Sequence, residues 1–489
     1  MSELLTITTL GELKKAKYVS KSIKQELRDN LIDNLRKDIP SFEGIHGYEN
    51  TVIPELERAI LSQHNINLLG LRGQAKTRLA RLMLNLLDAY IPVIEGSEIN
   101  DDPLNPISLF GRETVEKMGD KTPVSWMHRS ERFYEKLATP DVTISDLIGD
   151  IDPIKAANLK LSYANERVIH FGMIPRANRC IFVINELPDL QARIQVALFN
   201  ILEEGDIQIR GFKLRMPLDL QFVFTANPED YTNRGSIVTP LKDRIGSQIL
   251  THYPETVAIA QTITAQEAGL QDNRVVDVYV PNLAKELVEQ IGFEARLSEY
   301  IDLKSGISAR MSITAYENLM STAERRAIGN GEKATTVRFG DLMGMIPSIT
   351  GKVELVYEGE QEGAVMVAQT LLGMASKTLF LSRFPKIQKL TKENEKTPYD
   401  EVIHWFLQES NFELLDEFTE EEYHLQMDRI IPLNQLLERY HPEMIEQDKN
   451  FLKELVLWAL VEFKKLSKKR FAEGFTFNDL VNGYWSDVN

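Results

Sequence analysis

The stretch that most constrains the fold of this chain is a glycine-rich loop at residues 70–77, which reads Gly-Leu-Arg-Gly-Gln-Ala-Lys-Thr. A short apolar run at 65–69 precedes it and predicts a buried parallel strand, and the apolar spacing over 78–90 predicts a helix after it. A strand, a glycine-rich turn and a helix in this order are typical of a phosphate-binding loop, because backbone N–H groups of the turn point at phosphate oxygens. The sequence therefore predicts a nucleotide site here.

Single residues of this loop have separate expected roles. Lys76 is expected to reach the β and γ phosphates of ATP, and the Thr77 hydroxyl to bind Mg²⁺. Ala75 stands where the usual pattern G-x-x-x-x-G-K-[ST] has its second glycine, which is the mildest change as long as φ stays negative. The alternative is an ordinary strand-to-helix turn that happens to carry Lys-Thr. Motifs further along the chain argue against that alternative.

A second apolar run, residues 180–184, predicts another buried strand, and Asn185-Glu186 follows it. An acidic pair at such a strand end completes many NTPase sites, because the first residue holds Mg²⁺ and the second polarises the attacking water. Here Glu186 is present, but Asn185 keeps an oxygen acceptor without the negative charge. We expect Glu186 to be catalytic and Asn185 to weaken metal binding or turnover. A helix N-terminal acid is the alternative for Glu186.

Three further residues are candidates because of their position. Asn227 follows a predicted strand at 220–225, where a polar side chain can touch the γ-phosphate or the attacking water. Arg244 follows a polar loop and could reach a neighbouring subunit's nucleotide, and Arg310 starts a long amphipathic helix and could fold onto the γ-phosphate. An exposed helix cation is the alternative for each arginine. Residues 206–217 alternate around Gly211 and predict a β-hairpin.

Bulk properties bound the rest of the chain. Its 489 residues predict two to four domains, and 56 Lys and Arg against 72 Asp and Glu give a net charge of −16, which argues weakly against a nucleic-acid surface. The single Cys180 excludes an internal disulfide and a cysteine-rich zinc site. No signal peptide or membrane-spanning run is expected, so the predicted location is the cytoplasm. Residues 91–140 are expected to form a long loop, and residues 1–40 a solvated helical lead-in.

With these motifs in line, the chain resembles AAA+ ATPases, and within them the magnesium chelatase ATPase subunit and its MoxR-like relatives. The resemblance covers about residues 42–350. Asn227 matches sensor 1, Arg244 the arginine finger, Arg310 sensor 2, and the run 175–179 the chelatase lead-in to the Walker B strand. The family implies that Ile45 and Gly47 line the adenine, with simple packing as the alternative. The nucleotide contacts that the family implies in the Walker A loop are Gly70, Gly73, Gln74, Ala75, Lys76 and Thr77, with Thr77 and Asn185 at the metal.

The resemblance also implies an architecture. The expected fold class is α/β: a P-loop AAA+ ATPase domain with a parallel sheet, a helical lid and a C-terminal all-α extension. The expected boundaries are 1–40 for the lead-in, 41–251 for the nucleotide-binding domain, 252–385 for the lid and 386–489 for the extension. The family carries an insertion that would fall at about 150–175 and a pre-sensor hairpin at 206–217.

Several functions stay open at this point. The first is an ATP- and Mg²⁺-dependent ring motor, a hexamer by resemblance, that remodels a partner protein together with a separate von Willebrand A-domain protein. The second is the magnesium chelatase ATPase subunit itself, which the extra tail argues against. A sigma-factor activator is disfavoured because its Gly-Ala-Phe-Thr-Gly-Ala string does not occur in the sequence. A nucleotide-gated scaffold with little hydrolysis is permitted by Asn185.

Overall fold

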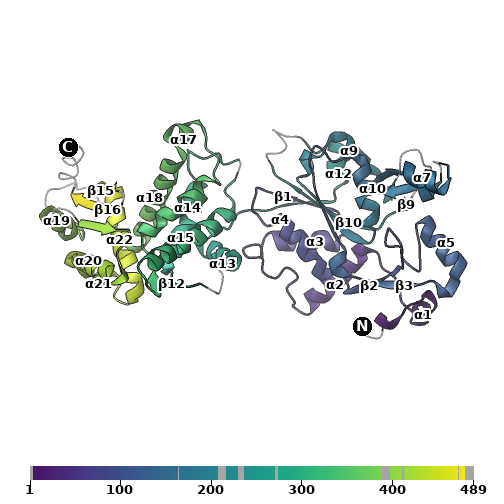
Figure 1. Ribbon diagram of the computed structural model, residues 1–489, viewed down its shortest axis with the longest axis horizontal. Coiled ribbons are helices and arrows are strands. Elements are labelled where there is room, and N and C mark those ends of the chain that lie inside the picture. Colours follow the sequence, from purple (N-terminus) through teal and green to yellow (C-terminus); the bar gives the residue numbers. More distant parts are fainter. Residues whose placement is uncertain are drawn as a thin grey trace. The chain divides into compact units, whose positions relative to one another are not determined.

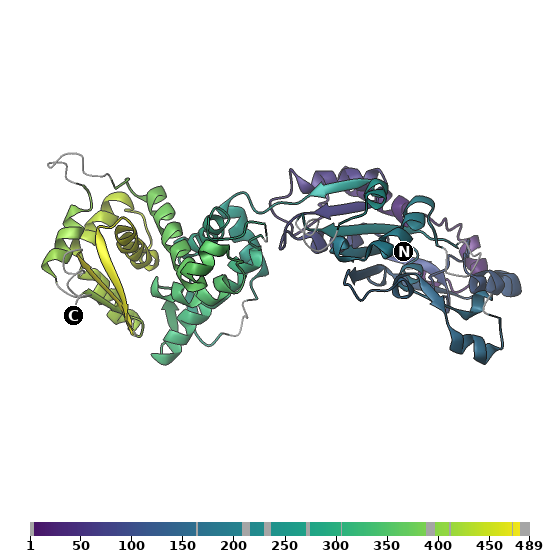
Figure 2. The ribbon, with the colours of Figure 1, turned by 90° about the horizontal axis from the view of Figure 1, so that it is seen from above.

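The computed structural model describes residues 4–162, 165–207, 216–228, 236–269, 274–304, 306–387, 397–409, 412–471 and 473–479. The chain divides into two compact units, Met1–His252 and Tyr253–Asn489. Each unit buries its apolar residues in cores of its own (Figures 1 and 2).

The first unit is built on a five-stranded parallel sheet in the order β11-β1-β10-β7-β4. Its strands are β1 (Ile66–Leu69), β4 (Phe133–Leu137), β7 (Cys180–Asn185), β10 (Leu220–Ala226) and β11 (Ser247–Leu250). The strand before the glycine-rich loop, β1, lies between β10 and β11. The loop therefore begins at the carboxyl end of an interior strand of the sheet. This arrangement confirms the parallel α/β P-loop fold predicted from the sequence.

Both faces of this sheet are covered, which explains the continuous apolar runs of its central strands. Along β7, Ile181 and Val183 face one core, whereas Phe182 and Ile184 face the other. The first face is covered by the helices α2 (Ile23–Arg36), α3 (Val52–Leu61) and α4 (Lys76–Leu82). The second face is covered by α9 (Ala192–Ala197), α10 (Phe199–Glu204) and α12 (Thr239–Arg244). Period-two alternation therefore places each strand residue in one of two cores.

Two expectations for the first unit are wrong. Residues 91–140 are not one long loop but contain β2 (Tyr90–Ile94), α5 (Leu109–Met118), β3 (Val124–His128) and β4. Strands β3 and β4 are short, carry polar residues and are mostly half-buried, and β4 lies at the edge of the sheet, so they lack the apolar runs of the central strands. The lead-in at 1–40 is not simply solvated, because α2 buries Leu27 and Leu31 in the core.

Two small elements lie where the resemblance places them. Strands β5 (Gly149–Ile151) and β6 (Ile169–Phe171) pair antiparallel around α7 (Pro153–Leu159), at the site of the expected insertion. Strands β8 (Asp206–Ile207) and β9 (Met216–Pro217) pair antiparallel, as the predicted hairpin requires. The tip of that hairpin lies outside the described residues.

The second unit is a helical assembly with one core that runs from Val280 to Phe477. Its longer helices are α13 (Val257–Glu267), α14 (Asn282–Ala295), α15 (Ala309–Gly329), α18 (Ala364–Arg383) and α22 (Glu446–Glu462). The extension, expected to be all-α, contributes α19 (Asp400–Gln408), α20 (Glu420–Asp428) and α21 (Ile431–Tyr440), and also an antiparallel sheet of β14 (Phe412–Leu415), β16 (Gly474–Asp479) and β15 (Leu466–Phe471).

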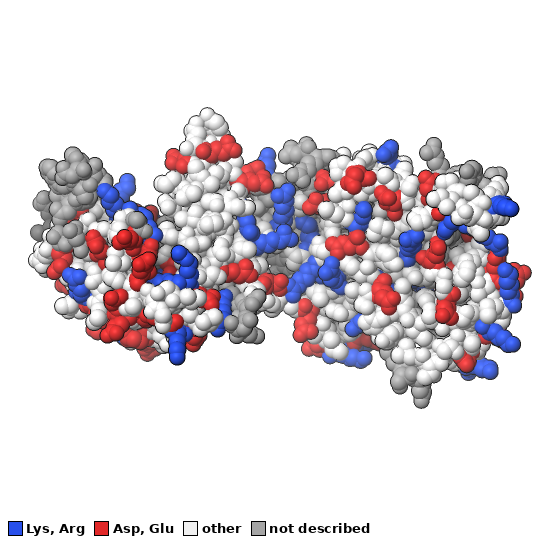
Figure 3. Space-filling model, viewed as in Figure 1, with Lys and Arg blue, Asp and Glu red and all other residues white. Residues whose placement is uncertain are grey.

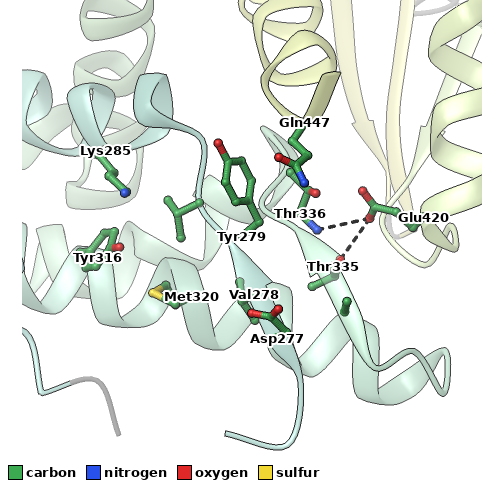
Figure 4. Close-up of a pocket in the computed structure, with 12 residues that line it drawn as sticks. Asp277, Val278, Tyr279, Lys285, Tyr316, Met320, Thr335, Thr336, Glu420 and Gln447 are labelled. Atoms are coloured by element: carbon green, nitrogen blue, oxygen red, sulfur yellow. Dashed lines mark hydrogen bonds between the residues drawn. The ribbon is translucent and has the colours of Figure 1, made fainter. Parts of the chain in front are cut away.

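The carboxylate of Glu420, at the start of α20, joins the extension to the rest of the second unit. It accepts hydrogen bonds from the Thr335 hydroxyl at 3.1 Å and the Thr336 N–H at 3.4 Å, both on β13 (Ala334–Thr336), as Figure 4 shows, and it pairs with Arg338 at 3.1 Å. Burial opposes the charge of Glu420, but hydrogen bonds from His424 and Arg338 outweigh it and lower its pKa to about 2. The extension is thus held by polar contacts as well as by the shared core.

Among the described residues, one helix, α18, is long and apolar enough to cross a membrane by length and composition. Half of its most apolar window is buried, and Leu371, Leu372 and Phe380 belong to the core of the second unit. Because α18 packs on α14 and α22, its apolar character is explained by that core.

Candidate nucleotide site

The glycine-rich loop has an unusual backbone at its last residue before α4. Ala75 has φ 54° and ψ 18°, in the left-handed region, so the condition under which alanine is the mildest replacement for glycine, a negative φ, is not met. A residue with a Cβ is disfavoured there by about 1–2 kcal/mol. Gly73 also has a positive φ, 73°, and a Cβ on Gly70 would collide with the side chains of Thr251 and Gln74. The chain therefore holds the loop in a shape that glycine suits best.

Lys76 and Asn227 come together although they lie 151 positions apart in the sequence. The Lys76 ammonium donates to the carbonyls of Gly70 and Leu71, the latter at 2.9 Å, and to Asn227 Oδ1 at 2.8 Å. Asn227 follows β10, the neighbour of β1, so parallel strand ends bring both residues to one edge of the sheet. The predicted phosphate-binding lysine and the predicted sensor are thus in direct contact.

Asn185 lies at the centre of a second hydrogen-bonded group. Its Oδ1 accepts from the Thr77 hydroxyl at 3.3 Å and from the Thr225 hydroxyl at 3.0 Å. Its Nδ2 donates to Glu135 Oε1 at 2.6 Å, and Glu135 also pairs with Arg81 at 2.8 Å. Thr77 and Asn185, the two predicted metal ligands, therefore share a hydrogen bond.

Glu186 has a left-handed backbone with φ 55°, a second strained position for a residue with a side chain. Its N–H donates to the Thr225 hydroxyl at 3.1 Å, which fixes this backbone to β10. Strain of this kind gathers at functional sites, because the surrounding structure must be built to hold it.

The segment predicted to line the adenine lies against the glycine-rich loop. Ile45 is buried in the core below it, and Gly47 has φ 82°. The phenol oxygen of the next residue, Tyr48, lies 3.1 Å from the carbonyl oxygen of Gln74 and 2.7 Å from that of His252, so its one proton can be donated to either. The segment is thus fastened to the loop, and its role at the adenine stays a prediction.

Of the two candidate arginines, Arg244 has partners of its own within the first unit, and Arg310 belongs to the second unit. Arg244, at the end of α12, is paired with Glu203 at 2.7 Å, donates to the Pro240 carbonyl at 2.8 Å and lies over the Phe199 ring. Arg310 belongs to the second unit, where it is exposed in the first turn of α15. A role for either residue at a nucleotide stays a prediction.

The donor set of the cluster fits ATP and Mg²⁺. Lys76 supplies a cation, and Thr77 and Asn185 supply the oxygen ligands that Mg²⁺ prefers. Glu186 supplies a carboxylate at the next residue. These groups come from the ends of β1, β7 and β10, which are adjacent in the sheet.

Sequence reasoning missed Glu135, Thr225 and Tyr48. Glu135 lies on β4, a strand that the sequence did not reveal, and its contact with Asn185 is made across strands. In the sequence, Thr225 is recognisable only as the last residue of a predicted strand. The polar residue at the carboxyl end of an otherwise apolar run is the signal that could have identified it.

No protein-family model matches the chain. Solved structures similar to it include a protein assigned as an ATPase from Cytophaga hutchinsonii, with 18% identity, a TM-score of 0.29 and coverage of 74% of this chain and 97% of that one. A complex of subunits BchI and BchD of magnesium chelatase has 17% identity, a TM-score of 0.33 and coverage of 66% and 98%. A mutant of RuvB from Thermotoga maritima has 12% identity, a TM-score of 0.37 and coverage of 91% and 98%. Likenesses this low carry no argument about function, which rests on the geometry above.

Proposed function

We infer that this chain is an AAA+ ATPase of the magnesium chelatase and MoxR-like group, which binds ATP with Mg²⁺ and hydrolyses it. One observation carries the proposal: Lys76 and Asn227, and Thr77 and Asn185, are joined by hydrogen bonds at the carboxyl edge of three adjacent parallel strands. Motifs that lie far apart in the sequence thus form one site.

The residues of this site would divide the work as follows. Lys76 would exchange its bonds to the Gly70 and Leu71 carbonyls for phosphate oxygens, and backbone N–H groups of the loop would hold the same phosphates. Thr77 and Asn185 would hold Mg²⁺, which neutralises phosphate charge. Glu186 would orient and polarise the attacking water, and Asn227 would contact that water or the γ-phosphate.

The finer part of the proposal concerns the assembly. We propose a homo-oligomeric ring, a hexamer by resemblance, in which Arg244 reaches the neighbouring subunit's nucleotide and Arg310 reaches its own. The ring would remodel or activate a partner protein together with a separate von Willebrand A-domain protein in the cytoplasm. On the face in Figure 3, both signs of charge mix over the first unit and acidic side chains gather over α20 and α21, which favours a protein partner over nucleic acid.

Two other functions keep some support. The magnesium chelatase ATPase subunit itself shares the same motifs. A nucleotide-gated scaffold with little turnover is favoured by one observation, the missing carboxylate at Asn185. Turnover separates the scaffold from the motor.

Steady-state hydrolysis of Mg-ATP, with binding of a fluorescent ATP analogue alongside, tests the proposal. We expect Lys76→Ala to lose binding, and Glu186→Gln to bind but lose turnover by about 10²-fold or more. Lys117→Ala, on an exposed lysine of α5, serves as the matched control and keeps both. A parent chain that binds tightly without turnover would exclude the motor, and a parent chain that does not bind would exclude both readings.

A further inference from the structure

The carboxylate that the Asn185 position lacks has a counterpart on the neighbouring strand. In the register of β4 and β7, Leu137 lies opposite Asn185, and Glu135 lies opposite Val183, two residues earlier. Glu135 and Asn185 therefore point to the same face of the sheet, because side chains alternate along a strand. Glu135 Oε1 lies 2.6 Å from Asn185 Nδ2.

The hydrogen bonds around Asn185 fix which way its amide points. A carboxylate only accepts, so the side-chain atom facing Glu135 must be the NH₂ group. The amide oxygen then faces Thr77 and Thr225, whose hydroxyls both donate to it. The Thr225 oxygen accepts from the Glu186 N–H through a lone pair, which leaves its single proton for the bond to Asn185. Every group in this network has one consistent role.

The charge of Glu135 acts on the amide that it holds. A carboxylate on the NH₂ side polarises the amide and makes its oxygen a stronger acceptor, as in other hydrogen-bonded chains of low exposure. The Glu135 side chain is 29% exposed, and its other oxygen pairs with Arg81, whose side chain is 63% exposed. Because the Arg81 guanidinium is the more exposed of the two groups, solvent screens its charge more than that of Glu135, and Arg81 offsets the field of Glu135 at Asn185 only in part.

We propose that Glu135 is a positioning residue that supplies, through Asn185, the negative charge that this ATPase site lacks at the end of β7. The inference rests on the proposed function and deepens it: Asn185 provides the oxygen for Mg²⁺, and Glu135 provides the charge and orients the amide. Outer carboxylates of this kind change metal affinity by about 10- to 100-fold when they are removed.

The test moves the carboxylate from position 135 to position 185 and the amide from position 185 to position 135. We compare the parent chain with E135Q, N185D and the double variant E135Q/N185D, and measure the Mg²⁺ concentration that half-saturates binding of a fluorescent ATP analogue. E135Q should raise this concentration by about tenfold or more. The double variant, which returns one carboxylate to the position at the end of β7, should restore it to near the parent value. Binding of the analogue without Mg²⁺, which depends on Lys76, is measured alongside, and the Mg²⁺ effect in each variant is taken relative to it.

The matched control is R81Q, which breaks the ion pair of Glu135 and leaves its carboxylate. If E135Q acted only by loosening β4 from α4, R81Q would reproduce its effect, and that result would overturn the inference. Unchanged Mg²⁺ dependence in a folded E135Q would also overturn it while leaving the proposed function intact. A parent chain that binds no nucleotide would overturn the proposed function itself.

The single variant N185D gives an answer even where E135Q does not fold. Because the site already has the charge of Glu135, N185D should bind Mg²⁺ no more tightly than the parent chain. A roughly tenfold tightening in N185D would show that the site lacked a charge, and it would contradict the inference.

Discussion

Ala75 carries a backbone cost that a single substitution removes. Its left-handed conformation disfavours a Cβ by about 1–2 kcal/mol. Glycine removes this strain but raises the conformational entropy of the unfolded chain, which offsets part of the gain in stability. We expect Ala75→Gly to raise the free energy of unfolding of the first unit by roughly 0.5–1 kcal/mol. Urea unfolding without nucleotide measures this change. Ala80→Gly, in the buried helix interior of α4, is the control with the opposite sign, and a loss of stability in both would contradict the assignment.

At the residue scale, candidate site residues could be predicted from the sequence where a motif is local. Lys76, Thr77 and Glu186 sit in short patterns next to recognisable strands, so their chemistry could be predicted. Asn227 could be predicted because it follows another recognisable strand. The sign of φ at Ala75 and the contact of Glu135 depend on how separate segments close around one another, which a linear pattern does not contain.

Helix α2 is joined to the sheet by a buried ion pair, which makes the strength of this attachment testable. Glu26 on α2 accepts two hydrogen bonds of 2.7 Å from the Arg132 guanidinium, just before β4, and the two side chains are 4% and 1% exposed. Glu26→Gln leaves a buried guanidinium without its charge partner and should lower the free energy of unfolding by about 3–5 kcal/mol.

A surface pair on the same helix provides the control. Asp29 pairs with Lys21 at 2.7 Å, with side chains 32% and 43% exposed. Asp29→Asn should cost less than about 1 kcal/mol. Calorimetry of both variants at one pH measures the difference, and equal losses would show that burial does not decide the strength of these pairs.

At the element scale, burial decided which elements could be predicted. Strands β1, β7 and β10 are buried on both faces and read as apolar runs. Strand β4 is half-exposed and carries Glu135 and Lys136, so its sequence resembles a loop. The helices of the extension show their apolar spacing, whereas β15, with Lys468, Lys469 and Arg470, does not show a strand pattern.

The second unit should lose stability as pH rises toward neutrality, because it holds a buried acid whose pKa is raised. Burial raises the pKa of Glu454 to about 7, and its carboxylate accepts from the Phe339 N–H at 2.6 Å. The folded chain then holds this proton more tightly than the unfolded chain. Glu454 therefore lowers the free energy of unfolding progressively as pH rises from about 4.5 to about 7, by roughly 3 kcal/mol at most.

Calorimetry of the full chain at pH values of about 5.5 and about 8 tests this dependence. The transition of the second unit should fall in temperature at the higher pH, and Glu454→Gln should reduce that fall. Glu443→Gln, on an exposed residue, is the control. An unchanged pH dependence in Glu454→Gln would contradict the role of this group.

The proposed ring makes a prediction that only mixed subunits can test. Arg244 is paired with Glu203 inside its own chain, so transfer to a neighbour would exchange that pair for a nucleotide. Arg244→Ala should lower turnover by about 10³-fold, as loss of an arginine finger does. Mixing Arg244→Ala with Lys76→Ala chains should restore part of the turnover, because one chain keeps a finger and the other keeps an intact loop. No recovery on mixing would place Arg244 outside the neighbour's site.

The position of the chain's single thiol allows unfolding of the first unit to be followed by thiol reactivity. Cys180 begins β7 with no exposed surface, and burial raises its pKa to about 12, so the thiolate that reacts with labelling reagents is scarce while the first unit is folded. The rate at which Cys180 reacts with a chromogenic disulfide therefore reports how often the first unit opens. A cysteine placed on the surface would be the one site that takes a dye, and the native chain is ready for single-site fluorescence without removal of its own thiol.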